Sequence, residues 1–293
     1  MSGSGAQASH TVQWERQSTW LSHLRKEKRR LQSSGVEGFD LLESMATLSI
    51  EHKLATHKDR CARCWHARLN CICSQLEGLV MDPSDIIGSC EVKILILMHH
   101  KEFMSAGNSA KLILQMFPLS TDLYIFGREG DIERLLSDVN ADHGKTILLW
   151  PGSDSMSTTD LMNQINDEAV ITELDDTSRS IHIRAIVLDG TYNQARNMYK
   201  SLKKKWGPRL PTAVSLRPHS ASVFHRANKN YGKAHLQQQQ SSDAVFRVST
   251  AEACGVLLYE LNVGGHGVMD KVTQAVKINN DALKYSRYHL TGD

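Results

Sequence analysis

The sequence predicts an α/β fold in which a mostly parallel sheet is flanked by helices. Short runs of consecutive apolar residues recur after about residue 90, and runs of this length are typical of strands buried on both faces. The segments between them are long enough for the crossover helices that parallel strands require. Four strong runs and two weaker ones are Val92–Met98, Leu123–Phe126, Thr146–Trp150 and Ile183–Leu188, then Ala213–Leu216 and Val245–Val248.

The composition is that of a folded protein. With 293 residues, 41 % of them hydrophobic and 23 % charged, the chain can bury a core of ordinary size, which excludes a wholly disordered protein. No apolar run approaches the roughly 20 residues of a membrane helix, so we expect no membrane partner. The polar start of the chain lacks the apolar stretch of a secretory signal, and we expect an intracellular protein, cytoplasmic or nuclear and not secreted.

Residues 1–57 are expected to form an N-terminal extension that is partly helical. Helical spacing is visible only in fragments, at Trp20–Leu24 and Phe39–Met45. No clear core pattern accompanies these fragments, and we expect the main domain to span residues 90–293.

Between these parts, residues 58–80 carry four cysteines within 13 positions. Cys61 and Cys64 are separated by two residues, and Cys71 and Cys73 by one. Four thiolates satisfy tetrahedral zinc, and a site closed by four sulfurs is structural. The alternatives are a redox dithiol and unligated buried thiols.

Other histidines and cysteines bear on the metal prediction. His57 and His66 are close enough in sequence to replace one sulfur ligand. Cys90 and Cys254 stand in apolar surroundings, and we predict that they are packing residues.

Small and polar residues follow three of the predicted strands. They lie at His99–Glu102, Pro151–Ser153 and Asp189–Thr191. Because ligands of open α/β sheets bind outside the carboxyl ends of the strands, these three turns form the candidate site.

Two helix starts are marked by capping boxes, at Thr191–Gln194 and Ser249–Glu252. Between these helices we predict a loop insertion near residues 229–243, because four consecutive glutamines and two serines form a low-complexity stretch there.

Positive charge is concentrated in one segment. Residues 190–242 contain no Asp or Glu but ten Lys and Arg. This distribution predicts a surface that faces a polyanion, with a solvated basic face as the alternative.

The segment Ala185–Arg196 resembles the Asp-x-Thr-Trp motif that names the DTW-domain family. Other segments resemble the remaining motifs of that family in the same order: the cysteine cluster, His99–Glu102, Asn108–Leu112, Leu149–Gly152 and Ser249–Ala253. The resemblance covers about residues 60–265. The sequence departs from the family pattern where Tyr192 replaces Trp, His100 replaces Pro, Ser109 replaces Thr, and Ala110 and Lys111 replace Gly and Arg. Arg226 and Arg247 both compete for the position of a family arginine.

The resemblance implies a tRNA-uridine aminocarboxypropyltransferase with a fold related to the SPOUT methyltransferases, and it leaves open whether the chain is knotted. Such an enzyme transfers the 3-amino-3-carboxypropyl group of S-adenosylmethionine to N3 of a tRNA uridine and releases methylthioadenosine. A SPOUT-like RNA methyltransferase and a noncatalytic zinc-dependent RNA-binding protein are the alternatives.

Site residues follow from these segments. We expect Asp189, at an exposed strand end, to act as the general base or to orient the imide of the uridine. The N–H groups of the helix that opens at Thr191 can hold the carboxylate of the donor. The residues assigned to the donor, S-adenosylmethionine, are His99, Glu102, Asn108, Trp150, Pro151, Gly152, Gly190, Thr191 and Tyr192. Those expected to hold tRNA phosphates are Arg196, Lys200, Lys203, Lys204, Lys205 and Arg226.

Overall fold

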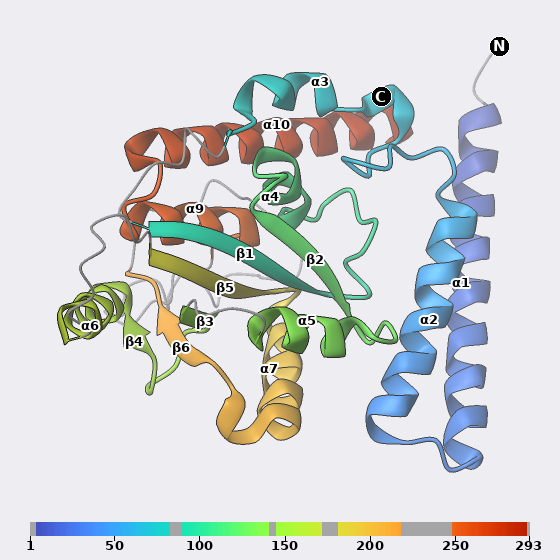
Figure 1. Cartoon of the computed structure of the whole chain (residues 1–293). Helices are drawn as coiled ribbons and strands as arrows, with labels where there is room; N and C mark the ends of the chain where they lie inside the picture. Colours follow the sequence, from blue (N-terminus) through green and yellow to red (C-terminus); the bar gives the residue numbers. More distant parts are fainter. Residues whose placement is uncertain (1–3, 83–89, 141–144, 172–180, 218–247, 292–293) are drawn as a thin grey trace, which may run out of the picture.

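The computed structural model describes residues 4–82, 90–140, 145–171, 181–217 and 248–291 (Figure 1). Within these residues the centre of the protein is one sheet of six strands in the order β2-β1-β5-β3-β6-β4. Every neighbouring pair of strands is parallel. The strands are β1 (Cys90–His99), β2 (Thr121–Phe126), β3 (Lys145–Leu149), β4 (Met156–Ser157), β5 (Ile181–Asp189) and β6 (Thr212–Ser215).

The apolar runs predicted most of these strands. Each of the four strong runs and the weaker run at Ala213 coincides with a strand. The two-residue strand β4 escaped prediction because it is too short to show a pattern. The run Val245–Val248 lies outside the described residues except for Val248, which belongs to no helix or strand.

Side chains of the central strands alternate between two apolar cores, one on each face of the sheet. On β1, Ile94, Ile96 and Met98 belong to one core, while Leu95 and Leu97 belong to the other. Successive side chains of a strand point to opposite faces, so a strand covered on both sides needs an uninterrupted apolar run. This explains why β1 was visible in the sequence.

Helices cover both faces of the sheet. In Figure 1, α4, α9 and α10 lie above it, and α5 and α7 lie below it. The described helices are α1 (Ser4–Ser33), α2 (Gly38–Thr56), α3 (Cys73–Leu76), α4 (Ala110–Met116), α5 (Asp131–Asn140), α6 (Thr158–Ile171), α7 (Tyr192–Trp206), α9 (Thr250–Glu260), α10 (Gly265–Thr291) and the short 3-10 helices η1 (Arg68–Asn70), η2 (Glu77–Leu79) and η4 (Gly207–Arg209).

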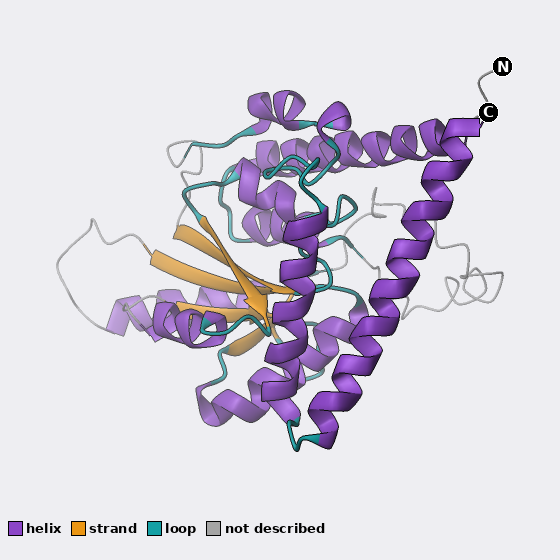
Figure 2. Cartoon of the chain, turned by 90° about the vertical axis from the view of Figure 1, so that its right-hand side faces the viewer, coloured by secondary structure: helices purple, strands orange, loops and turns teal. Residues whose placement is uncertain are grey.

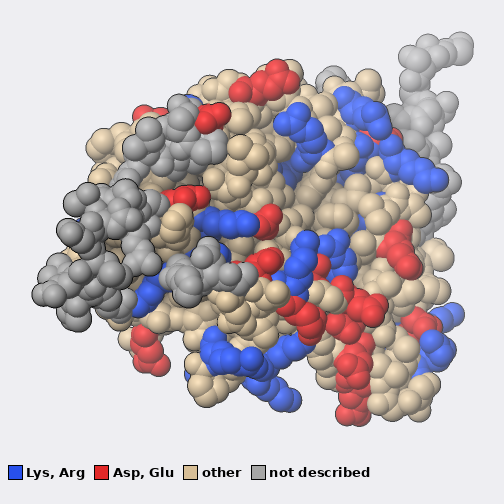
Figure 3. All heavy atoms as spheres, in the orientation of Figure 1, with Lys and Arg blue, Asp and Glu red and all other residues tan. Residues whose placement is uncertain are grey.

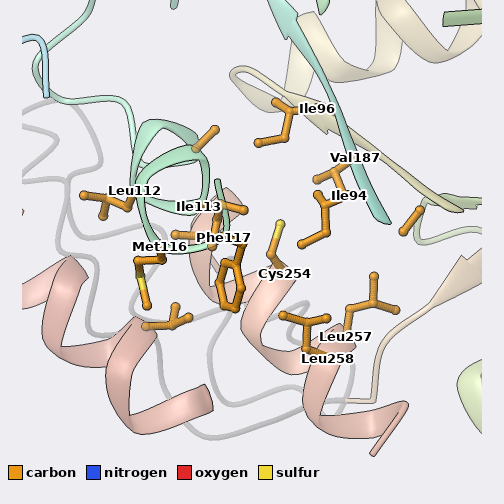
Figure 4. Packing of buried hydrophobic residues seen from close by; sticks show 14 of the residues in the cluster. Ile94, Ile96, Leu112, Ile113, Met116, Phe117, Val187, Cys254, Leu257 and Leu258 are labelled. Carbon is orange, nitrogen blue, oxygen red and sulfur yellow. The ribbon is translucent and has the colours of Figure 1, made fainter. Parts of the chain in front are cut away.

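The core above the sheet joins α4 and α9 to the central strands. Figure 4 shows Ile113 and Phe117 near Cys254 of α9, with Ile94 of β1 beside them. Cys254 is buried in this core, and so is Cys90. Their predicted packing role is confirmed.

The predicted fold class is thus confirmed: a parallel sheet flanked by helices, with a cysteine cluster before it. The relationship to SPOUT methyltransferases and the presence of a knot stay predictions. The loop insertion predicted near residues 229–243 lies outside the described residues.

The N-terminal helices α1 and α2 form a pair beside the sheet edge at β2 (Figures 1 and 2). The rings of Trp20 and His52 stack between the two helices, with centroids 3.8 Å apart. Gly127, just after β2, has φ +90°, and a Cβ there would lie 2.8 Å from the Cβ of Ala46 on α2. Only glycine allows both this backbone conformation and this close approach of α2.

None of the described helices is both long and apolar enough to cross a membrane.

Candidate active site and metal centre

Three distant segments of the chain meet at Asp189, the last residue of β5. Asn108 Nδ2 donates a hydrogen bond of 2.5 Å to Asp189 Oδ2, and Thr250 Oγ1 donates one of 2.6 Å to Oδ1. Asn108 stands just before α4, and Thr250 is the first residue of α9. Each carboxylate oxygen therefore accepts a hydrogen bond from a different segment.

The prediction that Asp189 is exposed is wrong, because the residue is only 3 % exposed. The starts of α4 and α9 cover the end of β5, and their polar side chains replace water around the carboxylate. Hydrogen bonds to an ionised acceptor are strong, and they offset much of the cost of burying its charge.

Further hydrogen bonds fix the two helix starts. The backbone N–H of Lys111 donates to Asn108 Oδ1 at 3.1 Å, which orients the amide toward Asp189. Ser109 Oγ accepts from the backbone N–H of Ala251 at 3.3 Å and so joins α4 to α9. The predicted capping box at Ser249 is confirmed.

The predicted capping box of α7 is also confirmed. The backbone N–H of Thr191 donates to Gln194 Oε1 at 2.6 Å, and the N–H of Gln194 donates to Thr191 Oγ1 at 3.4 Å. Because the box engages these two N–H groups, a donor carboxylate held at this helix start would have to use the groups of Tyr192 and Asn193.

Gly190 fits between the capping box and β1. A Cβ at this position would lie 3.0 Å from Gln194 Cβ and Oε1, and 3.4 Å from His99 Cβ. We expect Gly190→Ala to displace Gln194 and lower the free energy of unfolding by about 1 kcal/mol, the usual value of a helix N-cap. Urea denaturation measures this change.

The matched control is Gly267→Ala on α10, where a Cβ would meet no atom within 4 Å. This helical substitution should leave stability unchanged or raise it. Equal stability of Gly190→Ala and the wild-type protein would contradict the close packing described for Gly190.

Two stacked histidines stand at the end of β1, His99 as its last residue and His100 just after it. The rings of His99 and His100 lie 4.5 Å apart, and His99 Nδ1 accepts from the backbone N–H of Lys101 at 3.2 Å. Burial lowers the pKa of His99 to about 4 and that of His100 to about 3. Both imidazoles are therefore neutral at pH 7.

Lys53 of α2 holds the backbone of the loop formed by residues 100–103. Its Nζ donates to the carbonyl oxygens of His100 at 3.2 Å, Lys101 at 2.6 Å and Phe103 at 2.7 Å. Burial lowers the pKa of Lys53 to about 8, and the nearby Glu102 opposes that shift. A residue of the N-terminal helices thus fixes the loop that holds two predicted donor-binding residues.

Trp150 lies against α7. Its ring stacks on that of Tyr199, with centroids 4.6 Å apart and planes within 5°. Leu149 pairs with Val187, so β3 ends two residues before the level of Asp189. Pro151 and Gly152 continue into an exposed turn.

The outer face of α7 carries an aromatic ring and several cations. Tyr192 is 51 % exposed, and the Arg196 guanidinium lies 4.7 Å from its ring centroid. Lys and Arg side chains gather at the lower middle of Figure 3, where Figure 1 places α7. The exposed cations of this face are Arg196, Lys200, Lys203 and Lys204.

Two other predicted cations stand apart from this set. Lys205 forms an ion pair with Glu133 of α5, and its ammonium lies 4.4 Å from the ring centroid of Phe39 on α2. It therefore joins three helices. Arg226 lies outside the described residues.

The four clustered cysteines bring their sulfur atoms together. All four lie within 4.8 Å of one another, with Cys61 and Cys73 at 3.6 Å and Cys64 and Cys71 at 3.7 Å. Zn–S bonds of about 2.3 Å in a tetrahedron place sulfurs about 3.8 Å apart. The cluster can therefore hold a metal such as zinc.

The surroundings of the sulfurs fit this role. Burial raises the pKa of the Cys61 thiol, but hydrogen bonds with the backbone of Cys64 and Arg63 and with the thiols of Cys71 and Cys73 together outweigh it and lower the pKa to about 6. Burial raises the pKa of Cys64. A thiol that stays neutral in this apolar environment becomes a thiolate when it ligates a cation.

Of the two histidines considered as ligands, His66 is engaged elsewhere. Its Nε2 lies 3.0 Å from Asn279 Oδ1 on α10. Burial lowers the pKa of His66 to about 4. The metal-binding group within the described residues consists of cysteines alone.

Three residues of these sites were not predicted. Thr250 and Lys111 stand inside segments that resemble family motifs. This resemblance is the sequence signal that could have identified them. Lys53 has no such signal, because its partners lie 47 to 50 residues away and are backbone carbonyls.

Comparison with known proteins agrees with this geometry. A family model described as the DTW domain matches residues 58–283, which is most of the chain. Searches of curated proteins and of solved structures gave no match. The segments that meet at Asp189 and the cysteine cluster all lie within the matched range. The chain therefore belongs to the DTW-domain family, a family of tRNA-modifying enzymes.

Proposed function

We propose that this protein is a tRNA-uridine aminocarboxypropyltransferase that uses S-adenosylmethionine. The observation that carries the proposal is the meeting of Asn108 and Thr250 at Asp189. Segments that resemble family motifs and are far apart in the sequence surround the Asp189 carboxylate. This carboxylate lies at the carboxyl edge of a parallel sheet, which is where ligands of such sheets bind.

The reaction needs a base and an oriented donor. N3 of the uridine forms a bond to the carbon beside the sulfonium, the bond between that carbon and sulfur breaks, and its electron pair leaves with methylthioadenosine. The N3 proton passes to Asp189. A carboxylate has about four acceptor positions, and the hydrogen bonds from Asn108 and Thr250 use two of those of Asp189. Because Asp189 is nearly buried, we place it at the bottom of the uridine site.

Other residues prepare the two substrates. The first turn of α7 supplies N–H groups for the donor carboxylate, and Gly190 keeps the approach to them open. The neutral imidazoles of His99 and His100 belong to the same edge of the sheet, and Lys53 holds the backbone of the loop that follows them. A zinc ion at the cysteines would be structural and would hold the preceding segment in place.

We propose further that the chain is divided into an extension (1–57), a metal-binding segment (58–80) and a catalytic domain (90–293). Lys53 and Ala46 of the proposed extension lie against Lys101 and Gly127 of the proposed catalytic domain.

The outer face of α7 is the proposed tRNA surface. Arg196 and Lys200 are one helical turn apart, and Lys203 and Lys204 continue the same face. Tyr192 at its start is a ring on which a splayed base can stack. Salt releases such contacts, so tRNA affinity should fall as ionic strength rises.

We expect the double variant Lys203→Ala/Lys204→Ala to bind tRNA more weakly and to lower the slope of log K against log salt by about two units. Fluorescence titrations at several salt concentrations measure both quantities. Lys277→Ala, an exposed lysine of α10, is the charge-matched control and should bind normally. Equal slopes for the double variant and the control would place the tRNA elsewhere.

One experiment tests the reaction. Purified protein is incubated with bulk tRNA and carboxyl-labelled S-adenosylmethionine, and the nucleosides and the by-product are identified by mass spectrometry. Methylthioadenosine together with labelled uridine supports the proposal. S-adenosylhomocysteine would replace it with a methyltransferase, and tRNA binding without either by-product would indicate a noncatalytic RNA-binding protein.

A further inference from the structure

An apolar pocket that the proposed reaction does not use lies between α2, the cysteine segment and the loop after β1. Its volume is about 470 Å³, which is within the range of small-molecule sites. The pocket opens at the surface, because several of its wall residues are exposed. The walls include Leu54, Ala62, Arg63, Trp65, Phe103 and Met104.

Arg60 fixes two walls of this pocket. Its Nη1 donates to the carbonyl oxygen of Trp65 at 3.3 Å and to that of Met104 at 3.0 Å. Trp65 has φ 59° and Met104 has φ 56°, a left-handed conformation that few residues other than glycine adopt. Such strain persists only where the surroundings hold it, and it is concentrated at ligand sites. The rings of Trp65 and Phe103 meet edge to face, with centroids 5.7 Å apart. The pocket is therefore a built part of the structure.

Exposed cations accompany the pocket. The cysteine segment folds back on itself through a β-bridge between Arg60 and Ala67, and we call residues 58–69 the knuckle. Lys and Arg side chains gather at the upper right of Figure 3, where Figure 1 places the segment between α2 and α3. The exposed cations of the knuckle and of the loop beside it are Lys58, Arg63, Arg68 and Lys101. Within the residues that the structure describes, none of these four forms an ion pair. Free cations beside an apolar pocket match a partner that carries both phosphates and flat rings.

The pocket is close to the candidate active site along the chain. Met104 is four residues before Asn108, and four residues span at most about 14 Å. The N–H of Asn108 donates to the carbonyl oxygen of Ser105 at 3.0 Å, and the side chain of Asn108 donates to Asp189. Nucleotides that flank a uridine held at Asp189 can therefore reach the pocket.

We propose that this pocket receives an unstacked base of the tRNA, beside the target uridine, and that the four exposed cations hold the neighbouring phosphates. This inference rests on the proposed function, because it takes Asp189 as the uridine site. The base lies against the ring of Phe103 and the guanidinium of Arg63, since unstacked bases bind to aromatic rings and to the planes of arginines. The pocket thus contacts a base, whereas the cations of α7 contact phosphates.

The test measures tRNA binding by the full-length protein, without donor, at several salt concentrations. Phe103→Leu keeps the apolar bulk but removes the ring, and it should weaken binding about 5- to 100-fold at every salt concentration. The slope of log K against log salt should not change, because no cation is lost. The matched control is Phe39→Leu, since Phe39 is also half-buried and meets Phe126 edge to face but does not line the pocket. This control should bind tRNA as the wild-type protein does.

The cations should give the opposite result. Lys58→Ala/Arg68→Ala should lower the slope by about two units. If this variant behaved so while Phe103→Leu bound normally, the knuckle would be a basic face without a base site, and the proposal would be overturned. Thermal denaturation shows whether each variant is folded.

Photocrosslinking of the wild-type protein to tRNA needs no variant. Crosslinked bases should appear at residues 54–65 or 103–104, and crosslinks confined to α7 overturn the proposal. A wild-type dimer that Phe103→Leu dissociates, with tRNA affinity unchanged, would assign the pocket to a second copy of the chain. None of these measurements needs turnover, so the labelled-donor experiment judges the transferase proposal independently.

Discussion

Replacing Asp189 by Asn is expected to lower the rate of transfer by about 10²- to 10⁴-fold, the usual contribution of a general base. The amide keeps the shape of the side chain but offers one acceptor oxygen where Asp189 offers two. One of the donors on Asn108 and Thr250 would then face an NH2 group. A buried donor without an acceptor costs about 1–3 kcal/mol, so stability should fall as well.

Initial rates with labelled donor and thermal denaturation measure the two effects separately. Asp138→Asn on α5 is a matched control, because Asp138 accepts a hydrogen bond from the Tyr124 hydroxyl on the other side of the sheet. This control should lose some stability but keep its turnover. Full turnover in Asp189→Asn would remove this carboxylate from the chemistry.

Loss of the metal is expected to have the largest effect on stability. Structural zinc contributes about 10–16 kcal/mol of binding free energy in small zinc-binding peptides, and this energy is released only when the ligands are held together. Cys64 is fully buried and packs in the same core as α4 and α9. We expect Cys64→Ser to lose the metal. The variant should either unfold at a much lower urea concentration than the wild-type protein or fail to fold.

Metal content by mass spectrometry and urea denaturation check this result together. Cys90→Ser changes a buried cysteine whose Sγ donates to the carbonyl oxygen of Leu261, outside the cluster. That variant should keep one zinc per chain. If Cys64→Ser were as stable as Cys90→Ser, the cluster would be an ordinary part of the core.

The fold was predictable where local sequence decides the structure. The run Val92–Met98 is readable because its residues from Ile94 onward are all apolar and both faces of its strand are buried there. The capping boxes at Thr191 and Ser249 depend on residues three positions apart, and both formed as predicted. Helix α2 was predicted only as the fragment Phe39–Met45, because a buried residue such as Ala46 packs against Gly127, far along the chain.

The candidate site was predictable in its residue types and less so in its environment. The sequence offers Asp189 as a candidate, but the burial of this residue depends on two helix starts whose position no local pattern encodes. The cysteine pairs predicted a group of sulfur atoms that can hold a metal, whereas the buried Lys111 stands out in the sequence only as a departure from a family motif. Lys53 donates hydrogen bonds to backbone carbonyl oxygens. Because every residue has such an oxygen, the sequence does not indicate which residues Lys53 contacts.

The contacts at Asp189 also set an order of events during synthesis. Asn108 and Thr250 are 81 residues before and 61 residues after this carboxylate. Contacts between such distant residues form late, because long loops must close first. A nascent chain on the ribosome therefore cannot complete these contacts until residue 250 has emerged. Chains that end before residue 250 should therefore lack the contact from α9 to Asp189.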